Sequence, residues 1–279
     1  MTVHLLGAAE IRALAAELDV TPTKKLGQNF VVDANTVRKI VQVGAVGPTD
    51  RVVEIGPGLG SLTLAVLETG ARVVAVEIDH RLAARLAQTA AAHGVPEGAL
   101  TVIDADALQV TELPGEPSVL IANLPYNVSV PVLLHFMETF PHLQRGVVMV
   151  QAEVGERLAA PPGSKVYGAP SVKAAWYGTW RLAGTVSRQV FWPVPGVDSV
   201  LVGFHRDAVA RGTEEERRRT FRLVDAAFGQ RRKMLRQSLS AELGGTSAAA
   251  SVVLEAAGVA PTERGEQLTV DDFLRIARA

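Results

Sequence analysis

The tetrapeptide Asn123-Leu-Pro-Tyr126 has the residue types needed to act on the exocyclic amine of a nucleobase. The amine of adenine is planar, and its nitrogen is a poor nucleophile because the lone pair is delocalised into the ring. The side-chain oxygen of Asn123 and the carbonyl of Leu124 can each accept one amine hydrogen, which favours a pyramidal nitrogen with an available lone pair. Pro125 stiffens the turn, and Tyr126 offers a ring against which an extracted base can lie. Positioning and electrostatics would then carry the catalysis, and no strong base is required.

A second motif, Glu54-Ile-Gly-Pro-Gly-Leu-Gly60, follows a short apolar run and can hold a nucleoside-bearing cofactor. Its glycines Gly56, Gly58 and Gly60 allow the backbone to turn sharply and to approach a ligand closely. A glycine-rich turn between a strand and a helix also serves NAD enzymes, so this motif alone does not identify the cofactor.

Acids end the next two apolar runs. Glu77 can accept hydrogen bonds from both ribose hydroxyls of a nucleoside, which again suits either cofactor. Of Asp104 and Asp106, we expect Asp106 to accept a hydrogen bond from the adenine amine, because it lies further into the loop. Together with the amine-directed tetrapeptide, these acids predict methyl transfer from S-adenosylmethionine to an amino nitrogen. We expect no metal site.

Two further segments are candidates for the same site. In the aromatic and proline-rich stretch 191–199, Phe191 can supply the opposite face of a base sandwich, and stacking of this kind is worth about 1–3 kcal/mol per base. The alternative is that Phe191 and Trp192 fill the core. Near the N-terminus, Gln28 and Asn29 can close over the cofactor by short-range hydrogen bonds.

Basic residues gather late in the chain, although the formal net charge of the whole protein is −1. Residues 211–236 hold nine basic residues against four acidic ones, a local charge of +5. Such asymmetry indicates a polyanionic partner, and the alternative is a solvated helix face. The candidate phosphate contacts are Lys24, Lys25, Arg231, Arg232, Lys233 and Arg236.

The elements that must position these residues follow from an alternation of short β-branched runs with Ala- and Leu-rich segments of helical length. The runs are Val52–Ile55, Val73–Glu77, Thr101–Asp104, Val119–Ala122 and Val147–Val150. This alternation predicts an α/β fold, with a mainly parallel sheet and helices on both faces. We expect Val172–Trp180 and Val200–Phe204 to form an antiparallel pair that closes the sheet.

The character of the chain changes after the last of these runs. Thr213 and Thr269 are each followed three residues later by an acid, and these capping boxes predict two helices. We expect a cofactor-binding catalytic domain over residues 1–209, in which residues 1–20 are an N-terminal extension, and a small helical domain over residues 210–279.

Composition limits the class of protein. The apolar content of 48% is typical of a globular chain, and the absence of cysteine excludes disulfides, thiolate metal sites and cysteine nucleophiles. It also fits a cytoplasmic protein. The first twenty residues lack the pattern of a signal peptide, and no apolar stretch is long enough to span a bilayer, so we expect no membrane partner.

The chain resembles the small-subunit ribosomal RNA adenine dimethyltransferases, the KsgA-type enzymes, over everything beyond its first twenty residues. The stretches that carry the resemblance are Leu26–Phe30, Glu54–Gly60, Glu77–Asp79, Asp104–Asp106, Asn123–Asn127, Ser164–Gly168, Phe191–Ser199, Phe228–Lys233 and Arg264–Glu266. The resemblance implies a class I S-adenosylmethionine-dependent methyltransferase, with a Rossmann-like, mainly parallel seven-stranded sheet and a C-terminal helical domain that contacts RNA. It further implies dimethylation of the N6 amines of two adjacent adenosines in the 3′-terminal hairpin of 16S rRNA, during biogenesis of the small subunit.

The resemblance also assigns residues to roles. The positions that match cofactor contacts in the family are Asn29, Val31, Gly56, Glu77, Asp106 and Asn123. Those that match contacts to the target base are Asn123, Leu124, Tyr126 and Phe191. The chain departs from the family at Val31, where Leu is frequent, at Gly196, where Lys is common, and at Gly229, where Asn is frequent. None of these departures touches the transfer chemistry, but Gly196 removes one expected phosphate contact.

Two other functions remain open. A resistance methyltransferase acting on 23S rRNA shares the fold and an Asn-hydrophobic-Pro-Tyr motif, although Asn127 and the Gln-Arg-Arg-Lys stretch favour the small subunit. A non-catalytic ribosome-assembly factor is a different class, and the intact tetrapeptide argues against it. We expect the partner to be 16S rRNA in an immature small subunit, and the protein to be a cytoplasmic monomer.

Overall fold

The structure, a computed structural model, describes residues 2–20, 29–125 and 128–279. Its secondary structure belongs to two compact units. The first unit consists of Met1–Gly155 and Arg181–Arg206, and the second of Glu156–Trp180 and Asp207–Ala279.

The chain therefore crosses between the units three times, whereas the sequence pattern predicts one boundary after residue 209. Residues 156–180 join the helical unit because their side chains and backbone bond to it. The hydroxyl of Tyr167 donates to the carbonyl of Leu268 at 2.8 Å, and Arg231 donates to the carbonyl of Lys165 at 2.9 Å. Sequence patterns of single elements do not show such distant partners.

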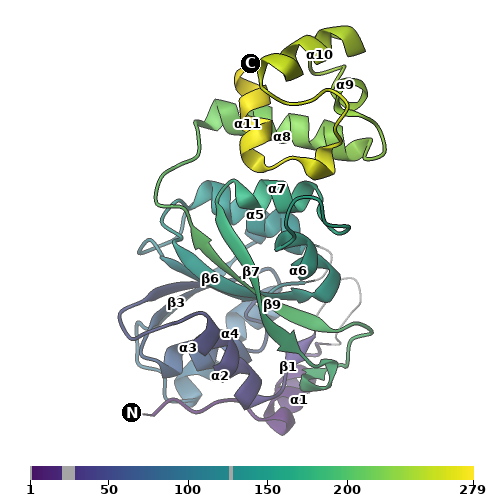
Figure 1. Cartoon of the computed structure of the whole chain (residues 1–279). Coiled ribbons are helices and arrows are strands. Elements are labelled where there is room, and N and C mark those ends of the chain that lie inside the picture. The colour runs from purple at the N-terminus through teal and green to yellow at the C-terminus, as the bar shows by residue number, and fades with distance from the viewer. Residues whose placement is uncertain (1, 21–28, 126–127) are drawn as a thin grey trace. The chain divides into compact units, whose positions relative to one another are not determined.

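The first unit is built on a seven-stranded sheet (Figure 1). Its strands, in spatial order, are β4 (Leu100–Asp104), β3 (Arg72–Glu77), β2 (Arg51–Ile55), β5 (Val119–Asn123), β6 (Arg145–Gln151), β9 (Ser199–Arg206) and β7 (Gly178–Val186), the first residues of which belong to the second unit. The five strands from β4 to β6 are parallel, and β9 runs antiparallel to β6. All five predicted β-branched runs are strands, so the expectation of a mainly parallel sheet is confirmed.

The sheet is covered on both faces, which explains why its central strands are apolar on both sides. Figure 1 shows α2 (Ala34–Val43), α3 (Ser61–Glu68) and α4 (His80–Ala92) on one face and α5 (Ser129–Thr139) on the other. The side chain of Asp79 caps α4 by accepting from the backbone N–H of Arg81, as its position in the sequence predicts.

The N-terminal residues are an integral part of this unit. Helix α1 (Ala8–Glu17) buries Ile11 and Ala15 in a cluster shared with α3 and α4. The cluster also includes Phe30 of the two-residue strand β1 (Phe30–Val31). β1 pairs antiparallel with β8 (Phe191–Trp192), which follows the short helix η2 (Arg188–Val190).

The second unit is helical apart from the start of β7. Its elements are the end of α6 (Ala152–Leu158), α7 (Ala169–Ala175), α8 (Glu214–Gly229), α9 (Leu235–Ser238), α10 (Ser247–Ala256), η3 (Gly265–Gln267) and α11 (Val270–Arg278). The capping boxes predicted at Thr213 and Thr269 are confirmed at the starts of α8 and α11. Among the described residues, no helix is long and apolar enough to cross a membrane.

One element was predicted wrongly. Residues Val172–Trp180 have a strand-like composition, yet helix α7 occupies the first half of this stretch and β7 begins only at Gly178. The helix starts because the backbone N–H of Gly168 donates to the Ser171 hydroxyl at 3.0 Å and Pro170 stands in the first turn. Burial of Val172 and Ala174 then outweighs the modest strand preference of the sequence.

Candidate functional site

The carboxyl ends of the parallel strands meet at one edge of the sheet, where open α/β sheets bind ligands. The glycine-rich loop follows β2 at this edge and is held to β3, since Gly56 N–H donates to the Val76 carbonyl at 2.9 Å. Gly58 and Gly60 have φ values of +58° and +96°, and Gly60 caps α3. A Cβ at Gly58 would lie 2.9 Å from Cε1 of Phe30, so only glycine fits there.

Glu77 ends β3 beside this loop and is 5% exposed. Its two carboxylate oxygens accept the backbone N–H groups of Gly58 and Asp79, each at 2.9 Å. Burial raises the pKa of Glu77, and the backbone hydrogen bonds offset part of that effect. Each carboxylate oxygen keeps a second lone pair, so the acid predicted to accept ribose hydroxyls can do so while it braces the loop.

The two acids at the end of β4 lie in different elements: Asp104 is the last residue of the strand, and Asp106 lies in the loop after it. Asp104 ends β4 and pairs with the ring of His80, and this contact raises the pKa of His80. Asp106 lies further into the loop, half-buried, and caps the short helix η1 (Ala107–Gln109) by accepting from Leu108 N–H at 2.9 Å. Asp106 is thus held in a fixed orientation, and its predicted hydrogen bond to an adenine amine stays a prediction.

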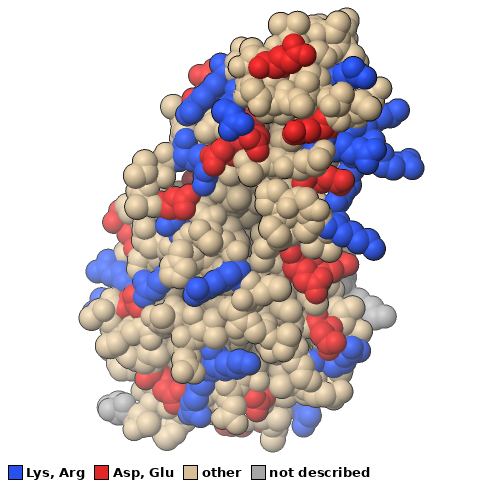
Figure 2. Space-filling view, viewed as in Figure 1, with Lys and Arg blue, Asp and Glu red and all other residues tan. Residues whose placement is uncertain are grey.

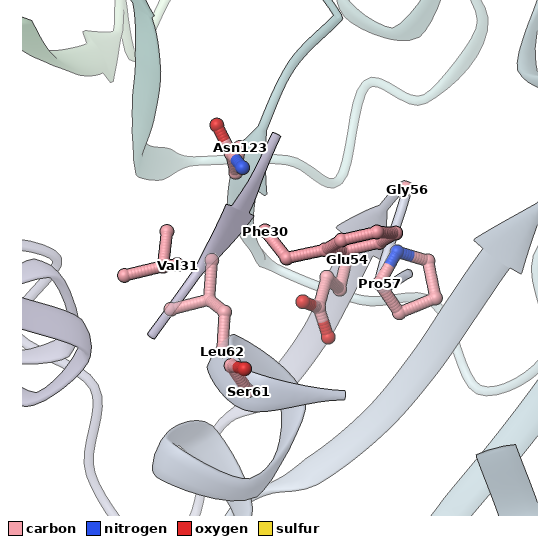
Figure 3. A pocket seen from close by; sticks show the side chains of 8 residues that line it. All are labelled: Phe30, Val31, Glu54, Gly56, Pro57, Ser61, Leu62 and Asn123. Carbon is pink, nitrogen blue, oxygen red and sulfur yellow. The ribbon is translucent and has the colours of Figure 1, made fainter. Parts of the chain in front are cut away.

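A pocket opens between the loop and the tip of β5 (Figure 3). Its lining residues are Phe30, Val31, Glu54, Gly56, Pro57, Ser61, Leu62 and Asn123. Three of the predicted site residues, Val31, Gly56 and Asn123, therefore meet in one cavity. Glu54 was not among the predicted site residues. It is an acid among the buried apolar residues of β2, and that placement is the signal that could have found it.

Asn123 stands at the end of β5 with its side chain fixed. Its Nδ2 donates to the backbone carbonyl of Asn29 at 3.0 Å, and a carbonyl can only accept. The amide group is therefore held with Oδ1, its acceptor, turned away from Asn29. Leu124 anchors the following turn, because its side chain is 1% exposed and its N–H donates to the Met149 carbonyl at 3.0 Å.

Phe191 lies in the core of the first unit. Its ring is 2% exposed and belongs to the core cluster that also contains Val31, its partner in the β1–β8 pairing. The structure thus gives Phe191 the core position that was the alternative, and its predicted contact with a base stays a prediction. The pairing also stacks Phe30 on Trp192, with ring centroids 6.4 Å apart, and so joins two motifs that are distant in the chain.

Several predicted residues lie outside the part of the chain that the structure describes. They are Lys24, Lys25, Gln28 and Tyr126. Their predicted contacts with phosphate, cofactor and base remain predictions. Among the described residues, no three His, Asp or Glu side chains gather in a way that could hold a metal ion.

The basic cluster of the second unit divides into two kinds of residue. Arg231 is bonded within the second unit, because its Nε donates to Glu266 at 2.7 Å and its Nη2 to the Lys165 carbonyl, and its predicted phosphate contact stays a prediction. Arg232, Lys233 and Arg236 have no ion pair with any residue that the structure describes, and Arg232 and Lys233 are exposed. Figure 2 shows the densest group of basic side chains over the end of α8.

The strand order and the loop after β2 define a class I S-adenosylmethionine-dependent methyltransferase. A family model described as "Ribosomal RNA adenine dimethylase" matches residues 21–279. The chain belongs to this family, and is thus an S-adenosylmethionine-dependent methyltransferase.

Relatives cover the chain almost end to end. A protein of Leifsonia xyli subsp. xyli named ribosomal RNA small subunit methyltransferase A is 69% identical, covering 99% of this chain and 98% of the relative. One of Kineococcus radiotolerans with the same name is 60% identical, covering 98% of this chain and 91% of the relative.

Two solved structures share the fold. A dimethyladenosine transferase from Plasmodium falciparum superposes with a TM-score of 0.75 at 24% identity, covering 88% of this chain and 94% of that one. The 23S rRNA methyltransferase ErmE has a TM-score of 0.67 at 25% identity, covering 90% of this chain and 98% of that one.

The pocket fits the cofactor of this family in its donor chemistry. S-adenosylmethionine offers ribose hydroxyls, an adenine amine and a positively charged methionine moiety. Glu77 and Asp106 offer acceptors for the ribose hydroxyls and the adenine amine, beside a loop whose glycines permit close approach.

Proposed function

We propose that the protein dimethylates the N6 amines of two adjacent adenosines in the 3′-terminal hairpin of 16S rRNA, during assembly of the small ribosomal subunit. The observation that carries this proposal is the fixed amide of Asn123 at the rim of the pocket, with Oδ1 available to an amine. Full-length relatives named for the small subunit support the choice of RNA.

In the proposed methyl transfer, the main task of the protein is to orient the adenine amine. The Oδ1 atom of Asn123 and the carbonyl of Leu124 would each accept one hydrogen of the adenine amine, and so direct its lone pair into the pocket. The backbone carbonyl of Asn29 accepts a hydrogen bond from Nδ2 of Asn123 and so fixes the orientation of its amide. The buried side chain of Leu124 fixes the position of the Leu124 carbonyl. The bound cofactor supplies the electrophilic methyl group. Preorganised polar groups of this kind act without reorganisation in the transition state.

The remaining site residues would hold the cofactor. Glu77 would accept its ribose hydroxyls and Asp106 its adenine amine, while Gly56 and Val31 offer backbone and apolar contact at the pocket wall. Tyr126 would supply the stacking face for the target base. Phe191 would supply the opposite face, which requires its ring to leave the core position that it has here.

The RNA would be held through its phosphates by Arg232, Lys233 and Arg236, with Lys24 and Lys25 as further candidates. Such contacts make affinity depend steeply on salt. We propose that the protein acts as a cytoplasmic monomer on an immature subunit, in which the hairpin is still accessible. Equal affinity for mature and immature subunits would contradict that part of the proposal.

The rival substrate is the large-subunit RNA, since the 23S rRNA methyltransferase ErmE shares the fold. Its identity to this chain is 25%, whereas the relatives named for the small subunit reach 69%. We therefore place the small-subunit RNA first and make the large subunit an arm of the test.

The test is to incubate the protein with labelled S-adenosylmethionine and undermethylated small subunits, with large subunits in parallel, and to map the modified nucleosides. We expect dimethyladenosine confined to the 3′ hairpin of the small-subunit RNA. Label in the large subunit would transfer the assignment to the rival enzyme. Tight binding to small subunits without label would instead indicate an assembly factor.

A further inference from the structure

Glu54 is a buried acid to which the transfer chemistry gives no task. It lies in β2 between Ala75 of β3 and Ile121 of β5, and 1% of its surface is exposed. Its side chain nevertheless lines the pocket, where Figure 3 shows its carboxylate directed toward the side of Ser61. Its Oε2 atom is buried without a hydrogen-bond partner among the described residues. An ionised carboxylate in such a place is costly unless a cation compensates it or a proton neutralises it.

No basic side chain compensates Glu54 within residues 2–20, 29–125 and 128–279, because every ion pair found there joins other acids. The groups that face it in the pocket from β1, α3 and β5 are uncharged: Phe30, Val31, Ser61, Leu62 and Asn123. The charged group that acts on it is another acid, Glu77 at the end of β3.

These surroundings favour the neutral acid. Burial raises the pKa of Glu54 to about 8; the nearby Thr63 hydroxyl lowers it in part, and the negative charge of Glu77 raises it again. The Oγ1 atom of Thr63 makes no hydrogen bond to any described residue. Without a ligand, the pocket therefore holds a carboxyl group that a molecule of suitable charge could ionise.

S-adenosylmethionine is such a molecule, because its sulfonium and ammonium groups outweigh its single carboxylate. We propose that Glu54 matches this positive charge: it is a neutral acid in the ligand-free protein and releases its proton to solvent when the cationic cofactor binds. The inference rests on the assignment of this pocket to the cofactor. It makes Glu54 a specificity-determining residue, which favours the cationic cofactor over neutral nucleosides such as 5′-methylthioadenosine.

The pH dependence follows from the direction of the shift. The ordinary pKa of the Glu side chain is 4.5, so between that value and about 8 the folded, ligand-free protein holds a proton that the unfolded chain has lost. Stability contributed by this group is present at low pH and falls as the pH rises toward 8. Cofactor binding should release about one proton at pH 7, where the ammonium group of the cofactor is already protonated.

The test is calorimetric titration of the full chain with S-adenosylmethionine, in buffers of different ionisation enthalpy, which yields the number of protons released. We expect about one proton at pH 7 for the wild type and none for Glu54→Gln, which is isosteric with the neutral acid. Glu68→Gln removes an acid of the same unit that pairs with Arg38, and should release as many protons as the wild type. The preference for S-adenosylmethionine over 5′-methylthioadenosine should fall about tenfold in Glu54→Gln.

Wild-type binding without proton release at pH 7 would overturn the inference, as would unchanged release by Glu54→Gln. If that variant does not fold, the wild type decides alone through its proton count at pH 7, where the ammonium group of the cofactor does not titrate appreciably. Failure of the wild type to bind S-adenosylmethionine at all would instead count against the assignment of the cofactor site.

Discussion

Asn123 is the residue on which the proposed chemistry depends most directly, because its amide is held on one side by the Asn29 carbonyl. We expect Asn123→Ala to reduce turnover about 10²-fold or more, as for loss of a preorganised polar group in other enzymes. The measurement is single-turnover methylation of undermethylated small subunits, with cofactor affinity and thermal unfolding recorded beside it. Gln144→Ala, which removes an exposed amide that bonds to the Pro141 carbonyl, is the matched control. A near-normal rate for Asn123→Ala would end its assigned role.

Single residues show where sequence reasoning succeeds and where it stops. Asn123 and Glu77 could be identified because their neighbours in the chain define the turn and the strand end that they occupy. Phe191 and Glu54 could not, because their roles depend on burial by residues far away in the sequence. Phe191 looks like a free aromatic residue in a proline-rich loop until the pairing of β1 with β8 places it in the core.

Helix α1 lies before the residues that the family model matches, yet its buried side chains pack into the first unit. Ile11 is fully buried in the cluster with Leu64 and Leu82. We expect Ile11→Ala to lower the free energy of unfolding by about 2–5 kcal/mol, because apolar burial is removed and a cavity is left behind. Denaturant unfolding followed by circular dichroism would measure it. The exposed neighbour Arg12, changed to Ala, should stay within about 0.5 kcal/mol of the wild type. Equal effects of the two changes would mean that α1 frays independently of the core.

Elements with local signals were predicted well, and those fixed by distant partners were not. The parallel strands and the capped helices α4, α8 and α11 carry their own signals, in apolar runs and in Asp or Thr caps. Helix α7 does not, because Val172–Trp180 has a strand-like composition and becomes helical only where its start is capped and its face is buried. The short pairing of β1 with β8 had no sequence signal, since two residues on each side are too few to show a period.

At the scale of the whole molecule, a net charge of −1 conceals a concentration of positive charge in the second unit. The formal balance reflects 28 basic and 29 acidic residues. Many of the arginines are paired, among them Arg211 with Asp207 and Asp271, and Arg278 with Glu216. Pairing reduces the field that a distant polyanion experiences, so the charges that matter for RNA are those without an acidic partner. The domain boundary also depends on contacts between distant parts of the chain. Residues 156–180 belong to the same unit as residues 207–279, and their position in the sequence does not show this.

The cations after α8 that have no ion pair with a described residue give a prediction about RNA binding. Changing Arg232, Lys233 and Arg236 together to Ala should weaken binding to small-subunit RNA. The slope of log affinity against log salt should fall by about 2–3, at about 0.7–0.9 for each phosphate that is no longer neutralised. Arg231 is left intact, since its bonds to Glu266 and to the Lys165 carbonyl hold the second unit together. Filter binding or fluorescence anisotropy over a salt series would give both slopes.

The matched control removes the same amount of charge elsewhere, by changing the exposed residues Arg12, Lys39 and Arg72 of the first unit to Ala. If net charge alone governs association, the two triple variants will lose equal affinity, and the slope of log affinity against log salt will fall equally in both. The cluster after α8 would then be a solvated face without phosphate contacts. If phosphates contact that cluster, only the first variant will change its slope, because the counterions released on binding are those of the phosphates it neutralises.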